Sequence, residues 1–344
     1  MTHDLTPPRK VLEQFALDPT SISSLSGGLI NLSFTARQLD GNECILQRVN
    51  VIFPPAIHDD IDAVTGHLLA KGLVTPTLLR TSGNRHHLEL DGAVWRLLTR
   101  VPGETREALT TDAEAREAGR VLGSFHAALA DFAQPLANQR PGVHDLARHL
   151  ENLRRTLSAK TFHPAQESVA ALAHEIFSLA ATLNPLPKLP SRLVHGDPKI
   201  SNVIFDHGRG VCLVDLDTIT RMPIPLELGD ALRSWCNLAA EDSPEAGFSI
   251  DRFAAALAGY REGAGELLTT EEWRAVPDGT LSIAIELAAR FAADALNESY
   301  FAWDRQRFAS ASEHNLARAA AQLRLARTIL EALPALKALV MTQV

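Results

Sequence analysis

The sequence predicts an α+β protein in which a small antiparallel sheet precedes a larger, mainly helical region. Short apolar runs separated by glycine-containing turns fill the first hundred residues, which indicates strands. Most of the remaining chain shows helical periodicity, and a further pair of short apolar runs lies near its middle. At 344 residues, the chain is long enough for two regions with cores of their own.

The composition is that of an ordinary soluble globular protein and excludes several classes of partner. Hydrophobic residues make up 46% of the chain and charged residues 22%. A net charge of −8 without a long basic run argues against nucleic acid as the main partner. No apolar run reaches the ~18 residues that a membrane helix needs, and no signal peptide is evident. Three cysteines without metal-type spacing fit a reducing, cytoplasmic setting.

The N-terminal region is predicted to form an antiparallel sheet. Strands are expected at residues 22–25, 32–39 and 44–49, with glycine or Asp-Gly turns between them. The first turn contains Gly27 and Gly28, and glycine lets backbone amides approach a phosphate closely. The same turn could be an ordinary hairpin, so the residues alone leave both interpretations open.

The C-terminal region is predicted to be mainly helical. Thr111 and Glu114 have the spacing of a capping box at the start of a helix. One apolar face then follows at helical spacing, formed by Ala118, Val121, Leu122, Phe125 and Leu129. His126 lies beside this face, and we expect it to be a hydrogen-bonded core residue.

The stretch between residues 193 and 217 is the most informative for function. Asp197 follows an apolar run, and Asn202 lies five residues later at the start of a second run. A strong turn signal at residues 206–210 separates this run from a third, which ends in Asp215. We expect Asn202 to enter one strand of a hairpin and Asp215 to leave the other, so that both lie near the same edge.

These residue types in this order suit phosphoryl transfer from a magnesium nucleotide. Such a reaction requires positioned reactants and neutralised charge. Asp197 can orient an acceptor hydroxyl and take its proton, whereas Asn202 and Asp215 offer the oxygen ligands that Mg²⁺ prefers. An isolated His-Gly-Asp sequence is usually only a turn, but the combination with the asparagine, the hairpin and the second aspartate indicates a catalytic site.

This pattern resembles the catalytic motif of the aminoglycoside phosphotransferase and choline kinase superfamily, which shares the protein-kinase-like fold. The loop of that superfamily has His-Gly-Asp where protein kinases have His-Arg-Asp, and its metal-binding aspartate lacks a following Phe-Gly. Both features are present here. The resemblance implies a bilobal protein-kinase-like fold, with an N-lobe at residues 1–101, a C-lobe at residues 102–344 and ATP bound between the lobes. Thr99 and Val101 would lie on the link that contacts adenine.

Flanking motifs resemble the N-acetylhexosamine 1-kinase branch of this superfamily. They extend over roughly residues 22 to 330 and comprise residues 28–34, 45–50, 64–68, 214–218, 228–233, 290–301 and 314–316. The resemblance implies a sugar acceptor that is phosphorylated at its anomeric hydroxyl.

The resemblance also assigns roles around the central motif. Asp197 is the expected catalytic base, and Lys199 matches a position that contacts the transferred phosphate. Asn202 and Asp215 are expected to bind Mg²⁺, and Asp217 to assist them. Lys199 could otherwise be a solvated loop residue.

The nucleotide-binding strand departs from the kinase pattern. Kinases place a lysine on the third strand, but this strand offers Gln47 and Arg48. Neighbouring residues on a strand face opposite sides, so only one of the two can face the nucleotide. Charge favours Arg48, whose guanidinium binds phosphate well, although alignment with kinases could equally favour Gln47. Asp59 is the expected carboxylate partner, but acidic residues favour helix N-termini in any case.

Four residues are expected to contact the acceptor: Arg290, Asp294, Tyr300 and Glu227. Arg290 and Asp294 are four residues apart and therefore share a helix face. They could equally form an intrahelical salt bridge beside a packing tyrosine.

The sequence therefore predicts a kinase that uses ATP and Mg²⁺ to phosphorylate a sugar hydroxyl, as a monomer or homodimer. The alternatives with the same active site are aminoglycoside, homoserine and amino-alcohol kinases. The absent strand lysine also leaves open a pseudokinase or a nucleotide-binding interaction module.

Overall fold

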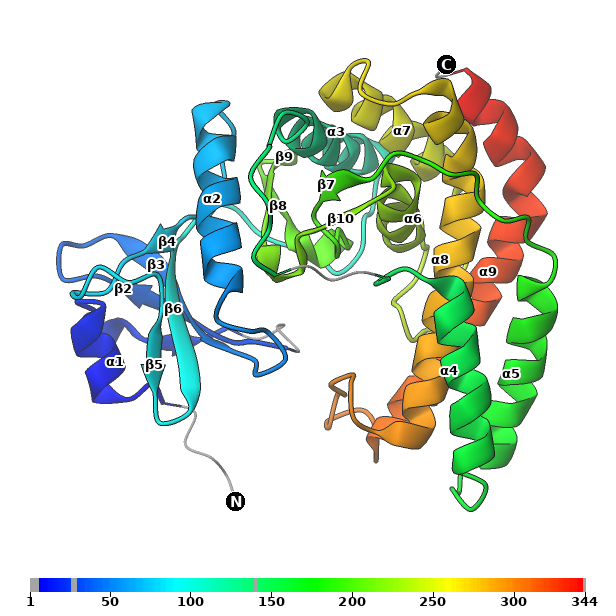
Figure 1. Ribbon diagram of the computed structural model, residues 1–344, viewed down its shortest axis with the longest axis horizontal. Coiled ribbons are helices and arrows are strands. Elements are labelled where there is room, and N and C mark those ends of the chain that lie inside the picture. Colours follow the sequence, from blue (N-terminus) through cyan, green and yellow to red (C-terminus); the bar gives the residue numbers. More distant parts are fainter. Residues whose placement is uncertain (1–5, 26–29, 139–141, 343–344) are drawn as a thin grey trace. The chain divides into compact units, whose positions relative to one another are not determined.

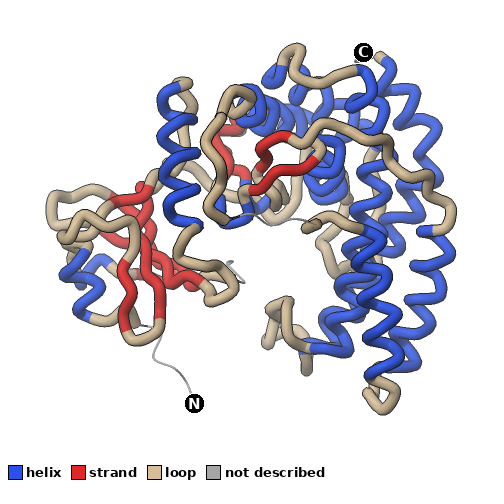
Figure 2. Tube along the Cα trace, viewed as in Figure 1, coloured by secondary structure: helices blue, strands red, loops and turns tan. Residues whose placement is uncertain are grey.

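The computed structural model describes residues 6–25, 30–138 and 142–342. The chain divides into two compact units. The N-terminal unit comprises residues 1–102 and 131–139, and the C-terminal unit comprises residues 103–130 and 140–344. The larger sheet lies in the first unit and most helices lie in the second (Figure 2). The predicted α+β class, with a small antiparallel sheet before a mainly helical region, is confirmed.

The N-terminal unit is built on one antiparallel sheet with the strand order β1-β2-β3-β6-β4, in which β5 also pairs with β6. The strands are β1 (Ser23–Ser24), β2 (Leu32–Arg37), β3 (Glu43–Val49), β4 (Leu78–Leu79), β5 (Leu88–Leu90) and β6 (Ala93–Thr99). The strands expected at residues 32–39 and 44–49 are confirmed as β2 and β3. Gly27 and Gly28 lie outside the described residues, so their predicted role stays a prediction.

The two faces of this sheet differ in their surroundings. One face packs against α1 (Arg9–Gln14) in a buried apolar cluster. The sheet residues of that cluster are Phe34, Ala36, Cys44, Leu46, Ala93, Trp95 and Leu97. Because side chains alternate along a strand, Gln47 of β3 lies on the opposite face. Arg96 of β6 is directly opposite Gln47 in the strand register and shares that face.

Polar contacts explain why residues 131–139 join the N-terminal unit. Asp60 of α2 (Ile57–Ala70) accepts hydrogen bonds from the backbone N–H groups of Ala137 and Asn138, at 2.7 and 2.8 Å. Lys71, which follows α2, forms an ion pair with Asp131. The N-lobe predicted at residues 1–101 did not include residues 131–139. The contacts that join these residues to α2 link positions far apart in the sequence, which the sequence alone does not reveal.

The C-terminal unit contains seven α-helices among its described residues (Figure 1). They are α3 (Asp112–Ala128), α4 (Leu146–Ala159), α5 (Gln166–Ala180), α6 (Ile224–Trp235), α7 (Ile250–Ala264), α8 (Thr270–Asn297) and α9 (Ala311–Met341). The predicted capping box at Thr111 and Glu114 is confirmed. His126 is buried and hydrogen-bonded to Tyr260, as expected. Across the described parts of the chain, no helix combines the length and apolar character needed to cross a membrane.

Two small two-stranded sheets lie among these helices. β7 (Arg192–Val194) pairs with β10 (Thr220–Met222), and β8 (Val203–Asp206) pairs with β9 (Arg209–Leu213). β7, β8 and β9 fall in the stretch around residues 193–217 that the sequence singled out, and β10 follows it directly. The predicted hairpin around residues 206–210 is therefore confirmed as β8 and β9.

Close helix packing holds the C-terminal unit together. A Cβ atom at Gly119 of α3 would lie 2.0 Å from the carbonyl oxygen of Ala256 in α7, and one at Gly259 of α7 would lie 1.8 Å from that of Arg116. The backbones of α3 and α7 therefore approach so closely that only glycine fits. The same holds between α6 and α8, where a Cβ at Gly279 would lie 2.3 Å from the carbonyl oxygen of Pro225.

We expect Gly259→Ala to lower the free energy of unfolding by about 1–3 kcal/mol, because the added methyl group must push α3 and α7 apart. Gly66→Ala is the control, since a Cβ there meets no atom within 4 Å. That substitution should instead stabilise α2 by roughly 0.5–1 kcal/mol. Urea unfolding followed by circular dichroism measures both. Equal effects of the two substitutions would contradict the packing argument.

Candidate active site

The loop at residues 195–202, here named the Asp197 loop, brings three predicted residues into one hydrogen-bonded group. Lys199 Nζ lies 2.6 Å from Asp197 Oδ2. Asn202 Nδ2 donates to the backbone oxygen of Asp197 at 2.8 Å and to its Oδ2 at 3.3 Å. The amide nitrogen of Asn202 is thus directed at Asp197, and its amide oxygen is the atom that can bind a cation.

The β8–β9 hairpin brings Asp215 to the Asp197 loop. The Val214 N–H donates to the backbone oxygen of Asn202 at 2.9 Å, which places the end of the hairpin beside the asparagine. Asp215 has φ +65°, a left-handed conformation that a non-glycine residue seldom adopts. It is half-buried, and Asp217 in the following short 3₁₀ helix is 2% exposed. Asn202 and Asp215 therefore flank the hairpin as the sequence predicted.

The oxygen atoms of Asn202, Asp215 and Asp217 suit a hard divalent cation. Mg²⁺ usually keeps several waters and is held by one or two carboxylates together with substrate phosphates. Within residues 6–25, 30–138 and 142–342, no three His, Cys, Asp or Glu side chains form a metal-binding group. An amide oxygen and two carboxylates near one end of the hairpin fit a Mg²⁺ ion that takes its remaining ligands from phosphate and water.

A buried carboxylate of α6 holds the start of the Asp197 loop. Glu227 is 0% exposed. It accepts hydrogen bonds from the backbone N–H groups of His195 at 2.8 Å and Gly196 at 3.0 Å. We expected Glu227 to contact the acceptor, but a fully buried side chain that binds the backbone of the loop acts instead as its anchor.

The C-terminal end of α6 binds the same loop again. Trp235 is fully buried, and its indole N–H donates to the backbone oxygen of Pro198 at 2.9 Å. The hydroxyl of Ser234 accepts a hydrogen bond from the Ile200 N–H at 3.1 Å. One helix therefore fixes the loop on both sides of Asp197.

Local geometry explains the His-Gly pair before Asp197. His195 Nδ1 accepts from the Asp197 N–H at 3.3 Å, and Nε2 lies 2.8 Å from the backbone oxygen of Val214. A neutral ring with its proton on Nε2 satisfies both contacts. Gly196 has φ +86°, and a Cβ there would lie 2.1 Å from the backbone oxygen of Thr218. Only glycine therefore fits at this position.

Opposing charges dominate the electrostatics of the Asp197 loop. Burial alone would raise the pKa of Asp197, but the Lys199 ammonium group and, further away, Arg233 hold it below its ordinary value of 3.8. Burial likewise opposes the charged form of Lys199, yet Asp197 and Asp215 raise the pKa of Lys199 above 10.5. Both side chains of the pair are therefore charged near neutral pH.

The other three residues predicted for the acceptor, Arg290, Asp294 and Tyr300, lie around the end of α8. Arg290 is 19% exposed and pairs with Glu286, one turn earlier, at 3.5 Å. Its guanidinium carbon lies 5.8 Å from the ring centroid of Tyr300, which is 51% exposed. Arg290 therefore forms an intrahelical ion pair beside Tyr300, as in the alternative left open by the sequence, but its partner is Glu286 and not Asp294.

Asp294 shapes the loop that carries Tyr300. Its side chain is 4% exposed. It accepts hydrogen bonds from the backbone N–H groups of Ser299 at 3.1 Å, Tyr300 at 3.0 Å and Phe301 at 2.8 Å, and from Asn315 Nδ2 at 3.1 Å. These donors engage both carboxylate oxygens. We expected Asp294 to contact the acceptor, but its contacts are those of a residue that positions Tyr300.

The structure brings together only part of the residues that were predicted to bind the nucleotide. Arg48 is exposed and lies on the face of β3 that also carries Leu46. Its expected partner Asp59 is 73% exposed and lies 3.2 Å from His86 Nδ1. The Thr99 N–H donates to the backbone oxygen of Thr77 at 2.9 Å, and Val101 is 9% exposed. Asp59 therefore pairs with a histidine of the same unit rather than with Arg48.

Arg96 and Glu286 are among the buried charged residues that the sequence reasoning did not single out. Arg96 is 1% exposed on β6, and Glu286 is 1% exposed on α8. In the sequence, each of the two could have been recognised as a single charged residue within an apolar stretch. Arg96 lies within residues 94–98 and Glu286 within residues 281–289.

Glu286 also affects a buried histidine. Burial alone would lower the pKa of His144, but the Glu286 carboxylate, 3.1 Å from the Nδ1 atom of His144, raises this pKa above 6.5.

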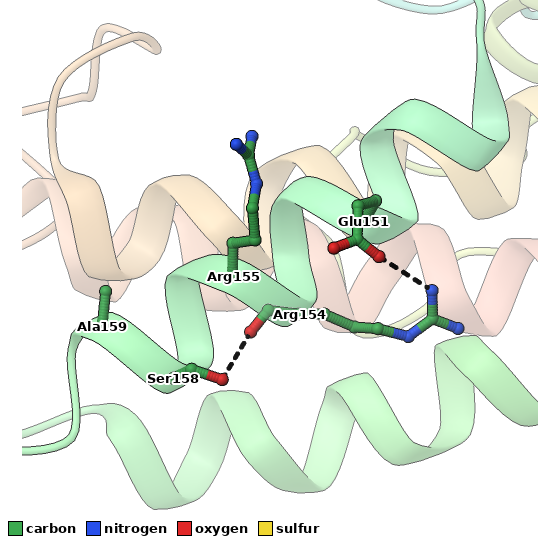
Figure 3. A pocket seen from close by; sticks show the side chains of 5 residues that line it. All are labelled: Glu151, Arg154, Arg155, Ser158 and Ala159. Atoms are coloured by element: carbon green, nitrogen blue, oxygen red, sulfur yellow. Dashed lines mark hydrogen bonds and ion pairs between the residues drawn. The ribbon is translucent and has the colours of Figure 1, made fainter.

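A hollow on the surface of α4 is separate from these residues. Figure 3 shows its lining, which consists of Glu151, Arg154, Arg155, Ser158 and Ala159. Arg154 forms an ion pair with Glu151 at 3.5 Å. None of the five belongs to the Asp197 loop, the hairpin or the end of α8, so this hollow is not the candidate site.

A family model and a relative of known name each match most of this chain. A model described as "Phosphotransferase enzyme family" matches residues 21–276. A homoserine kinase from Xanthobacter autotrophicus is 25% identical over 253 residues, which cover 70% of this chain and 71% of the relative.

Solved structures with low sequence identity share the fold. An amicoumacin kinase in complex with AMP-PNP and Ca²⁺ has a TM-score of 0.63 at 14% identity, with 92% of this chain and 91% of that chain covered. A microcompartment-associated aminopropanol kinase has a TM-score of 0.62 at 16% identity, with 94% and 97% covered. A choline kinase from Cryptosporidium parvum has a TM-score of 0.60 at 12% identity, with 97% and 96% covered.

Replacing Lys199 by methionine should raise the pKa of Asp197. The ammonium group that lowers this pKa is then gone, while the burial that raises it remains. Carbon-13 NMR titration of labelled aspartate side chains, with the signal assigned by Asp197→Asn, measures the shift. Lys188→Met is the control, because it removes an exposed lysine outside the loop. An unchanged pKa in Lys199→Met would contradict the proposed charge pair.

Proposed function

The chain belongs to the phosphotransferase enzyme family, and from this premise we propose that it transfers the γ-phosphoryl group of ATP to a sugar hydroxyl. As a member of that family it is a small-molecule kinase with a hydroxyl acceptor. The proposed acceptor is an N-acetylhexosamine or a related hexose, phosphorylated at its anomeric hydroxyl. The Asp197 loop and the hairpin then form the catalytic part of the C-terminal unit.

Asp197 orients the acceptor hydroxyl in the proposed reaction. The hydroxyl oxygen forms a bond to the γ-phosphorus as the bond to the bridging oxygen of ADP breaks, and the proton passes to Asp197. A carboxylate with a lowered pKa is a weak base, so it takes this proton late, when the new phosphate bond has made the hydroxyl acidic. Lys199, 2.6 Å from Asp197, would stabilise the negative charge of the transferred group.

Asn202 and Asp215, assisted by Asp217, would hold Mg²⁺. When bound, this ion neutralises phosphate charge and aligns the phosphates. Glu227 and Gly196 contribute indirectly, because they fix the backbone of the Asp197 loop. The complete set of Asp197, Asn202 and Asp215 argues against the pseudokinase alternative.

The surroundings of Arg290 support the sugar acceptor. A partly exposed guanidinium lies beside the half-exposed ring of Tyr300. An aromatic face and hydrogen-bond donors suit a neutral, polyhydroxylated ring, whereas a positively charged amine would be repelled by Arg290. This surrounding favours a sugar over choline and polycationic aminoglycosides as the proposed acceptor.

Homoserine is the second candidate acceptor. The relative that is 25% identical over 253 residues is named a homoserine kinase. Arg290 also suits this acceptor, because a guanidinium binds an amino-acid carboxylate through paired hydrogen bonds. The two candidates therefore share the catalytic residues and differ only in what Arg290 binds.

We expect magnesium ATP and a free sugar to release ADP, and Asp197→Ala to abolish this release. The panel contains N-acetylglucosamine, N-acetylgalactosamine, free hexoses, homoserine, choline and kanamycin. Turnover with homoserine alone would replace the sugar by the second candidate. Turnover only with choline or kanamycin would contradict both. If the protein binds ATP but phosphorylates nothing in a wider set of hydroxyl acceptors, the kinase proposal fails.

Arg290→Ala should raise the KM of the acceptor by roughly 10- to 100-fold, because a charged hydrogen-bond donor is lost. The KM of ATP should change little. Arg274→Ala is the matched control, since Arg274 is an exposed arginine on the same helix α8. Initial-rate kinetics at varied acceptor and ATP concentrations measure both constants. Equal changes in the two KM values would argue that Arg290 has no direct role in acceptor binding.

A further inference from the structure

Two helices hold the loop at residues 298–310, here named the Tyr300 loop. From α8, Asp294 accepts hydrogen bonds from the backbone N–H groups of residues 299–301. From α9, Arg318 Nη1 donates to the backbone oxygen of Ala302 at 2.9 Å. The backbone next to Tyr300 is therefore bound by side chains of both helices.

His314 of α9 adds a contact further along the same loop. Its Nδ1 atom accepts a hydrogen bond from the Asp304 N–H at 3.1 Å, and its Nε2 atom lies 3.0 Å from Asp242 Oδ2. A backbone N–H can only donate, so Nδ1 carries no proton, and the Nε2–H group donates to the carboxylate. The side chains of His314 and Asp242 are only 4% and 7% exposed. These contacts require a neutral ring with its proton on Nε2.

Charged groups from three segments surround His314. Arg307 of the Tyr300 loop pairs with Asp242 at 2.9 Å, and Arg318, one turn further along α9, lies 3.8 Å from Glu241. Burial and then Arg318 lower the pKa of His314 below 6.5, and Arg307 acts in the same direction, whereas Asp242 raises this pKa. His314 is therefore neutral at neutral pH, as its hydrogen bonds require.

The Tyr300 loop carries the aromatic rings that lie beside Arg290. The guanidinium carbon of Arg290 lies 5.8 Å from the ring centroid of Tyr300 and 5.5 Å from that of Phe301. A shift of the loop backbone would therefore move both rings relative to Arg290.

We propose that His314 is a positioning residue for acceptor binding, because its neutral ring holds the Tyr300 loop through the Asp304 N–H. This inference rests on the proposed function, in which Arg290 and Tyr300 bind the acceptor. A proton on Nδ1 would set a donor against the N–H donor of Asp304, and the contact would be lost. Acceptor binding should therefore weaken when His314 is protonated, while ATP binding should not follow the state of His314.

Initial-rate kinetics between about pH 5 and 8 test this role. The acceptor is the compound of the panel that gives the highest turnover. Because the pKa of His314 lies below 6.5, the acceptor KM of the wild type should rise as the pH falls through that pKa. At neutral pH, His314→Leu should raise the acceptor KM by roughly 10-fold, since hydrogen bonds to the loop are lost, and leave the KM of ATP unchanged.

His314→Asn is the conservative variant. Its amide oxygen can accept the Asp304 N–H in place of Nδ1, but the amide does not titrate. Its acceptor KM should lie near that of the wild type at neutral pH and lack the rise that protonation of His314 causes. ATP and the other histidines titrate in both proteins, so the difference between the two profiles isolates His314. His174→Leu is the matched control, since His174 is an exposed histidine on α5.

Hydrogen–deuterium exchange measures the Tyr300 loop directly and requires no acceptor. We expect His314→Leu to speed the exchange of backbone amides at residues 299–304 and to leave residues 195–202 unchanged. Asp242→Asn keeps the proposal testable if His314→Leu does not fold. It removes the charge that raises the pKa of His314, so the rise of the acceptor KM should move to lower pH.

The possible outcomes separate this inference from the proposed function. An unchanged acceptor KM in His314→Leu, or a rise at low pH that His314→Asn retains in full, would overturn the inference alone. Equal increases in the KM of ATP and of the acceptor would also overturn it, because they would make His314 a purely structural residue. Unchanged exchange at residues 299–304 would show that His314 does not hold the loop. A wild-type protein that phosphorylates no acceptor would overturn the proposed function and this inference together.

Discussion

The arrangement of the candidate site depends on one buried carboxylate, Glu227 of α6. A carboxylate without contact to water is stable only when hydrogen-bond donors surround it, and here the donors include two backbone N–H groups of the Asp197 loop. The Asp197 loop and α6 therefore stabilise each other. The same constraint extends outward, because α6 contacts α8 so closely at Gly279 that a side chain would not fit. The long helices of the C-terminal unit thus determine where Asp197 lies.

The sequence predicted the part of the site that is local in the chain. Asp197, Asn202 and Asp215 lie within nineteen residues, and short strands and a turn are enough to bring them together. Glu227 and Asp294 were expected to contact the acceptor, but in the structure they have other contacts. Their carboxylates bind backbone N–H groups, and no residue pattern shows whether a carboxylate on a helix will face a ligand or a loop of its own chain. Such a choice is made by tertiary packing, which decides what each side chain meets.

The N-terminal unit shows a second limit of reasoning from one strand at a time. The alternation of side chains correctly separates Gln47 from Arg48, because neighbouring positions face opposite sides. It says nothing about which residue of the adjacent strand lies opposite Gln47. The register supplies Arg96 there, 49 residues further along the chain. A charge missing from one strand can therefore be present on the same face of the sheet, where only the pairing of the strands reveals it.

Two separate anchors hold the Asp197 loop and the loop that carries Tyr300. Glu227 of α6 holds the Asp197 loop, whereas Asp294 of α8 holds the loop that carries Tyr300. Each anchor is a single carboxylate that accepts hydrogen bonds from backbone N–H groups. The side chains of the loop are therefore not needed for these anchoring contacts. Residues of the Tyr300 loop can therefore change without disturbing the backbone around Asp197. Two such independent anchors allow the Tyr300 loop to vary in sequence while the Asp197 loop keeps its backbone geometry, and a fold that varies in this way can host different functions.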